Sequence, residues 1–216
     1  KMGDGIKPTI YSHFTLGDMA AYYMLEEERQ VELLLVPVQK EKELNEKFDA
    51  LFDSKRLHGD SLIQVKLLND MYPGAYGPGT SMRNSETIDM CRFEKQIHKT
   101  EGAKEVIETY LEDGRGHNFI HTLTWTKGEY ALGSTTTIIN NADTPTTLEL
   151  LTSFSLGLIS PFEEADASEC LKLHRIRSKW SQEGRLVTES AEDLQLEPSW
   201  AYWQVNSTRY GQIGSM

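Results

Sequence analysis

The sequence of 216 residues has little cysteine and no long apolar run, and each shortage excludes a class of protein. Only Cys91 and Cys170 are present, too few for a small secreted disulfide scaffold and without the spacing of metal ligands. The longest apolar run, Val31 to Val38, has the length of a strand and cannot span a bilayer. We therefore expect two reduced thiols, a cytoplasmic location and no membrane partner.

Basic side chains are also scarce relative to acidic ones. The chain has 22 Lys and Arg against 33 Asp and Glu, which gives a formal net charge of −11 at pH 7. A surface of this sign repels phosphate groups, so nucleic acid and anionic membranes are excluded as expected partners. A neutral ligand such as a sugar is not disfavoured by this charge.

Common catalytic and cofactor motifs are absent from the sequence. It contains no Gly-x-Ser-x-Gly elbow, phosphate-binding loop, dinucleotide fingerprint or metalloprotease helix. His117 and His121 are four residues apart in a strand-like segment, and their even separation places them on one strand face. No neighbouring cysteine or carboxylate completes a ligand set, so we expect no metal site and no cofactor.

Short segments rich in Thr, Val, Ile and Tyr, separated by Gly and Asn turns, predict a mainly β fold. The expected strands cover residues 10–16, 20–25, 31–38, 61–68, 92–99, 106–111, 119–126, 130–139, 146–151 and 153–159. The continuous apolar character of Val31 to Val38 predicts a strand in a sheet interior. The turn residues from Asn140 to Pro145 predict a hairpin between the strands on either side.

One clear amphipathic helix is predicted, from Glu41 to Ser54. Leu44, Phe48, Leu51 and Phe52 share one face at helical spacing. We expect this face to cover a sheet of the same chain rather than to bind a partner. The predicted architecture is therefore a large antiparallel β-sandwich (a supersandwich) over residues 6–216, with one or two short helices.

The loop from Tyr72 to Arg83 is the first candidate binding element. Tyr72 and Tyr76 have flat faces suited to stacking on sugars, the glycines permit close approach of the backbone, and Arg83 offers a rigid fork of donors. Ser81 adds a hydroxyl to the same loop. We name these four as candidate substrate contacts; the alternative is an ordinary long surface loop.

The second candidate element is a cluster of cationic and aromatic residues near the end of the sequence. Arg175 and Arg177 share one face of a predicted strand, and His174 lies on the other. With Trp180 and Trp200 they form a candidate domain interface; the alternatives are exposed basic positions and core tryptophans. The final residues, Gly-Gln-Ile-Gly-Ser-Met, predict a piece cut from a longer protein.

Taken in order, several phrases of the sequence resemble the N-terminal region of bacterial α-galactosidases of glycoside hydrolase family 36. The phrases are HRIRSKWSQEGR (174–185), LEPSW (196–200) and YGQIGSM (210–216), with NNAD (140–143) and LELLTSF (148–154) further back. The resemblance implies a β-sandwich domain that precedes a catalytic (β/α)8 barrel in a retaining enzyme. Because the barrel supplies both catalytic aspartates in this family, the resemblance implies no catalytic residue in this chain.

The resemblance also implies partners: the enzyme's own barrel, an α-galactoside sugar, and further copies in a homo-oligomer. In the family, a loop of the form Gly-x-Gly-Asp-x-Arg contacts the substrate. Here Gly77, Gly79 and Arg83 match, but no Asp is present and the spacing is one residue longer. This departure leaves the sugar open, including other α-galactosides and α-N-acetylgalactosaminides. The alternatives are a free-standing carbohydrate-binding module, which would use Tyr72, Tyr76 and an exposed Trp, and a scaffold without ligand contact.

Overall fold

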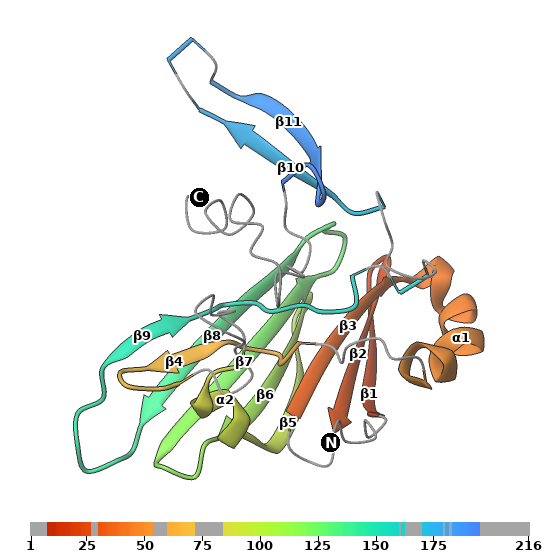
Figure 1. Ribbon diagram of the computed structural model, residues 1–216. Helices are drawn as coiled ribbons and strands as arrows, with labels where there is room; N and C mark the ends of the chain where they lie inside the picture. Colours follow the sequence, from red (N-terminus) through yellow and green to blue (C-terminus); the bar gives the residue numbers. More distant parts are fainter. Residues whose placement is uncertain are drawn as a thin grey trace. The chain divides into compact units, whose positions relative to one another are not determined.

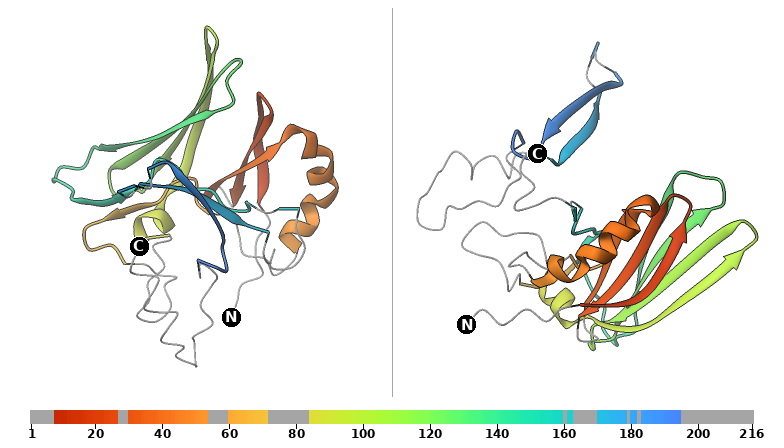
Figure 2. Two further views of the ribbon diagram at one scale, coloured as in Figure 1. Left: turned by 90° about the horizontal axis from the view of Figure 1, so that it is seen from above. Right: turned by 90° about the vertical axis from the view of Figure 1, so that its right-hand side faces the viewer.

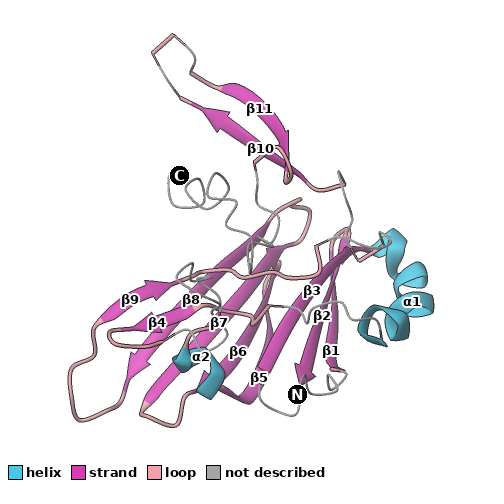
Figure 3. Ribbon diagram, viewed as in Figure 1, coloured by secondary structure: helices cyan, strands magenta, loops and turns pink. Residues whose placement is uncertain are grey.

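The computed structural model describes residues 8–26, 30–53, 60–71, 84–159, 161–162, 170–178, 180–181 and 183–194. Within them the protein is mainly β, with antiparallel sheets and two short α-helices (Figures 1 and 3). The chain divides into two compact units. The described residues up to Ile159 belong to the first unit, and those from Pro161 onward belong to the second.

The first sheet of the larger unit contains three antiparallel strands in the order β1-β2-β3. Their bounds are β1 Thr9–Leu16, β2 Met19–Glu26 and β3 Gln30–Pro37. Strand β3 lies at the edge of this sheet, not between two strands as predicted. It is nevertheless buried on both faces, with Leu33 and Leu34 almost fully inaccessible. Its open edge is covered near Val31, whose carbonyl accepts a hydrogen bond from Leu62 N at 2.7 Å.

The predicted helix is confirmed and covers the outer face of this sheet (Figure 2). A short 3-10 turn, Val38–Lys40, leads into α1, Glu41–Asp53. The side chain of Leu44 is completely buried. Glu41 ties the start of the helix to the sheet, because it accepts a hydrogen bond from the hydroxyl of Tyr22 at 2.6 Å.

The second sheet contains four consecutive antiparallel strands, β5-β6-β7-β8. They are β5 Arg92–Glu101, β6 Lys104–Glu112, β7 His117–Thr126 and β8 Leu132–Asn140. Strand β7 alternates strictly between buried and half-buried side chains over its first eight residues, as a strand with one buried face should. Its inward residues join both sheets in one core, with Tyr23, Val31, Leu33, Ile107, Leu111, Phe119 and Leu123 among its members.

Two short elements close one end of the core. Strand β4, Val65–Leu67, pairs antiparallel with β9, Leu148–Leu151. Helix α2, Glu86–Met90, was not predicted; Ser85 caps it by accepting a hydrogen bond from Ile88 N at 3.3 Å. The predicted hairpin across Asn140–Pro145 is wrong, because β9 leaves β8 and pairs with β4 instead.

Two predicted strands are shorter or absent. Of residues 61–68, only Val65–Leu67 forms a strand, and the side chains from Ser61 to Val65 are all buried. Residues 153–159 form no strand. Leu158 has φ 50°, a left-handed conformation that interrupts extended backbone.

The smaller unit contains one antiparallel hairpin. Strand β10, Lys172–Arg177, pairs with β11, Arg185–Ser190. Its register confirms the predicted faces: Arg175 and Arg177 lie opposite Val187 and Arg185, whereas His174 lies opposite Thr188 on the other face.

These observations confirm the predicted class, a mainly β antiparallel sandwich with short helices. The single domain over residues 6–216 stays a prediction. Neither α1 nor α2 has the length and apolar character that a membrane-spanning helix needs, and no other described helix does.

The two cysteines differ sharply in accessibility, which makes a simple test of the core. Cys91 follows α2 and is buried, and burial is the main factor that raises the pKa of its thiol to about 12; Cys170 is exposed. Because the thiolate is the nucleophile, we expect Ellman's reagent at pH 8 to modify one thiol rapidly and the second only after denaturation. Rapid modification of both thiols in the native protein would contradict the placement of Cys91.

Candidate functional site

The turn between β6 and β7 carries an acidic side chain that organises its own backbone. Asp113 is buried, and its Oδ1 accepts hydrogen bonds from Arg115 N at 2.8 Å and His117 N at 3.1 Å. Its Oδ2 accepts from Arg115 Nε at 3.1 Å and lies 2.8 Å from His117 Nδ1. Burial opposes ionisation, but these hydrogen bonds outweigh it and hold the pKa of Asp113 below its usual value.

A glycine in the same turn lets a distant loop approach. Gly116 has φ 96°, and a Cβ there would lie 3.0 Å from the backbone nitrogen of Ala142. Its carbonyl accepts a hydrogen bond from Asn141 N at 2.8 Å. Any larger residue would therefore push away the segment that leads from β8 to β9. This close approach positions Thr146 over the turn.

Thr146 completes a hydrogen-bonded chain of three side chains. Its Oγ1 lies 2.8 Å from His117 Nε2, and the other ring nitrogen faces Asp113. A carboxylate only accepts, so Nδ1 must carry the hydrogen; in the neutral ring, Nε2 then accepts from the hydroxyl of Thr146. The Thr146 oxygen is thus left with its lone pairs for other donors.

A carboxylate, an imidazole and a hydroxyl in this order can also activate a nucleophile. Acyl transfer further requires donors held ready for a developing oxyanion. Arg115 is the cationic side chain that lines the same cavity, and its guanidinium already pairs with Asp113, Asp70 and Thr87. The described geometry therefore supports a fixed hydroxyl better than an acyl-transfer centre.

Arg115 connects the turn to β4 and α2. Its Nη1 lies 3.5 Å from Asp70 Oδ1, and its Nη2 donates to Thr87. Asp70 is also buried, and its Oδ2 accepts from Leu67 N at 2.9 Å and from the hydroxyl of Thr87. Two carboxylates thus enclose one guanidinium, and the three groups together carry one formal negative charge.

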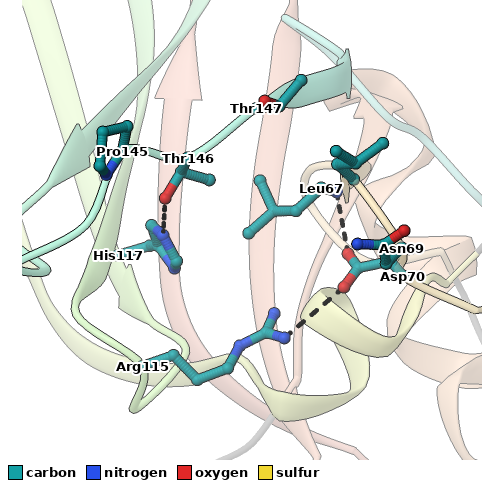
Figure 4. Close-up of a pocket in the computed structure, with 9 residues that line it drawn as sticks. Leu67, Asn69, Asp70, Arg115, His117, Pro145, Thr146 and Thr147 are labelled. Atoms are coloured by element: carbon teal, nitrogen blue, oxygen red, sulfur yellow. Dashed lines mark hydrogen bonds and ion pairs between the residues drawn. The ribbon is translucent and has the colours of Figure 1, made fainter.

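Asp70, Arg115, His117 and Thr146 line a cavity of about 280 Å³ in the larger unit (Figure 4). Its walls come from the segment after β4, from the β6–β7 turn and from the segment before β9. The lining residues are Leu67, Leu68, Asn69, Asp70, Arg115, His117, Pro145, Thr146 and Thr147. In Figure 4, Thr146 and His117 form one wall, and Asn69 and Asp70 form the facing one.

The candidate substrate contacts Tyr72, Tyr76, Ser81 and Arg83 lie outside the described residues, as does Trp200. The remaining candidate interface residues, His174, Arg175, Arg177 and Trp180, belong to the smaller unit. The structure therefore describes four of the nine predicted site residues, and all four lie in or next to the β10–β11 hairpin.

On one face of the hairpin, the two arginines share an acidic partner. Arg175 pairs with Glu189, and Arg177 Nη2 lies 3.6 Å from the same carboxylate. On the other face, His174 Nδ1 lies 2.8 Å from Thr188 Oγ1. The arginine charges are thus already partly compensated within the hairpin.

The face that carries His174 is also apolar at its tip. Ile176 and Leu186 are cross-strand partners, and their side chains are 75% and 62% exposed. Trp180, in the segment between the strands, is 94% exposed. In the described residues of the smaller unit, these three form the most exposed large apolar set, which we call the hairpin tip patch.

His117 and His121 lie on one face of β7, as predicted, and both are buried. They serve different contacts: His121 Nε2 lies 2.9 Å from Ser134 Oγ, far along the strand from the turn. No group of three potential metal-binding side chains gathers anywhere in the described part of the chain.

The sequence reasoning treated Asp113 to Gly116 only as a turn and missed the cavity. One signal was available in the sequence. Asp113 precedes Arg115 by two residues and His117 by four, in a turn that contains two glycines, and an aspartate at this spacing can accept hydrogen bonds from the backbone amides of both residues. Thr146 and Asp70 had no such signal, because their proximity depends on the pairing of β4 with β9.

Comparison with known proteins gives no further support: no family model, no curated protein and no solved structure matches the chain.

Proposed function

We propose that this chain is a non-catalytic β-sandwich domain of an α-galactosidase-like retaining glycoside hydrolase. In this proposal it packs on the catalytic barrel of the same enzyme, helps to form a homo-oligomer and offers the loop from Tyr72 to Arg83 to the active site. The ordered sequence phrases and the mainly β sandwich support it.

The observation that carries the proposal is the hairpin tip patch, Ile176, Trp180 and Leu186. An isolated two-stranded hairpin is marginally stable in water, and large apolar side chains at such exposure are typical of surfaces that bind another protein. The opposite face of the hairpin carries arginines, and arginine and aromatic side chains are both enriched in protein–protein interfaces. A barrel docked on this hairpin would bury the patch.

The first test compares two purified proteins, the 216-residue chain and the full-length product of its gene. We expect the full-length product to hydrolyse p-nitrophenyl α-galactoside and the 216-residue chain to show no hydrolysis above background. Hydrolysis by the 216-residue chain would contradict a non-catalytic domain. An inactive full-length product without a barrel would contradict the enzyme assignment.

The second test uses Ile176→Asp in the full-length product. A carboxylate placed in a buried interface is costly, so we expect the activity or the melting temperature of the full-length product to fall clearly. Ile139→Asp is the matched control, because Ile139 is exposed on β8. Equal effects of the two substitutions would contradict the proposal that the hairpin lies in the interface.

A second candidate function is a free-standing carbohydrate-binding module. The exposed indole of Trp180 favours it, because a flat aromatic face stacks on sugar rings. Saturable sugar binding by the 216-residue chain that disappears in Trp180→Ala would support the module. Sugar binding that is unchanged in Trp180→Ala would contradict a module that binds through this indole.

A further inference from the structure

We propose that the cavity between the β6–β7 turn and the segment before β9 binds a small neutral ligand with adjacent hydroxyl groups, the size of one sugar ring. This cavity lies wholly within the larger unit and involves none of the residues that carry the proposed function. The inference does not rest on that function.

The charge balance of the cavity selects a neutral ligand. Arg115 is the one lysine or arginine among the lining residues, and it pairs with the carboxylates of both Asp70 and Asp113, so these three groups together carry one formal negative charge that repels an anion. An anion would have to displace a buried carboxylate from this cation. A cation would meet the guanidinium itself, 3.5 Å from Asp70. A neutral ligand leaves both ion pairs intact.

The pattern of donors and acceptors fits hydroxyl groups. With a neutral His117 ring, the Thr146 hydroxyl donates its hydrogen to Nε2 and its oxygen presents lone pairs. Arg115 has five N–H donors, and the contacts to Asp113, Asp70 and Thr87 engage three of them. The amide of Asn69 offers both a donor and an acceptor. Each hydroxyl of a sugar both donates and accepts, so adjacent hydroxyls can use these groups together.

The cavity is small and its polar wall is rigid. Its volume of about 280 Å³ lies just below the usual range of about 300–1,000 Å³ for pockets that hold drug-sized ligands, so one ring is the largest expected occupant. His117 is buried and bonded at both nitrogens, which fixes the direction of the Thr146 hydroxyl. A ligand therefore meets a preorganised acceptor.

The experiment titrates the ¹⁵N-labelled 216-residue chain with D-galactose, D-glucose and, separately, inorganic phosphate. We expect saturable shifts of the backbone amides of Asn69, Thr146 and Thr147 with a millimolar Kd for at least one sugar, and no such shifts with phosphate. Thr146→Val should weaken binding at least fivefold. Thr137→Val, at an exposed site on β8, is the matched control and should leave Kd unchanged.

Because Thr146→Val also removes a contact of His117, a second variant separates binding from folding. Asn69→Gly removes the amide without straining the backbone, since Asn69 already has φ 73°. It should weaken binding several-fold while the melting temperature stays close to that of the parent chain. Absence of saturation up to 100 mM sugar, stronger shifts with phosphate, or unchanged Kd in both variants would each overturn the proposal.

Discussion

Asp113→Ala is expected to lower the free energy of unfolding by about 3–5 kcal/mol, the cost of removing one partner from a buried ion pair. The carboxylate accepts hydrogen bonds from two backbone amides and from the side chains of Arg115 and His117. Alanine would leave the backbone amides of Arg115 and His117 and the buried ring of His117 without this acceptor. Urea unfolding at pH 7 and low salt measures the difference.

Asp113→Asn separates the charge from the shape of the side chain. The asparagine amide presents donors to His117 or Arg115, which is unfavourable, but it keeps one acceptor oxygen. Because of this oxygen, we expect a loss of stability smaller than that of alanine. Asp143→Ala is the control, because Asp143 is exposed in the segment after β8 and should change stability by less than about 0.5 kcal/mol. A loss below 1 kcal/mol for Asp113→Ala would mean that the turn does not depend on this carboxylate.

The sequence predicted the larger unit well where one strand follows the next. Strands β5 to β8 form a consecutive antiparallel sheet, so local alternation and turn residues were sufficient to find them. The helix α1 was equally clear, because Leu44 and Phe48 repeat at helical spacing among charged residues. In both cases the pattern of neighbours along the chain contains the information.

The prediction failed where strands pair across a long separation. Residues 140–145 have good hairpin chemistry, yet the chain continues past β8 and pairs with β4, about eighty residues earlier in the sequence. Pairing with β4 lets Leu151 pack against the core while Ser134 of β8 donates to Ser153 O at 2.6 Å. Local turn propensity does not contain information about this competing pairing of distant strands.

The cavity was missed for the same reason. Its groups come from three segments, at Asp70, at Arg115 and at Thr146, and only the pairing of β4 with β9 brings the first and last together. The hairpin faces, in contrast, were predicted correctly, because strand alternation alone decides that Arg175 and Arg177 point one way and His174 the other.

The second large effect concerns pH and the core histidine His121. Its imidazole is completely buried on β7, and burial lowers its pKa from 6.5 to about 4. The unfolded chain therefore takes up a proton near pH 6.5, whereas the folded protein resists protonation until about pH 4. Stability is fully present above pH 6.5 and is lost as the pH falls toward 4, by about 2 kcal/mol between pH 7 and pH 4.5.

Two variants assign this loss to His121. His121→Leu removes the titrating group and should lose about 2 kcal/mol less between pH 7 and pH 4.5 than the parent chain, as measured by urea unfolding at both pH values. Thr136→Val is the matched control: Thr136 faces His121 across β7 and β8, and its buried hydroxyl makes no hydrogen bond with the described residues. It removes a polar group but no titrating one, so the full pH dependence should remain. If His121→Leu kept the same pH dependence as the parent, the loss would belong to other groups, because the proton taken up on unfolding would not bind to the imidazole of His121.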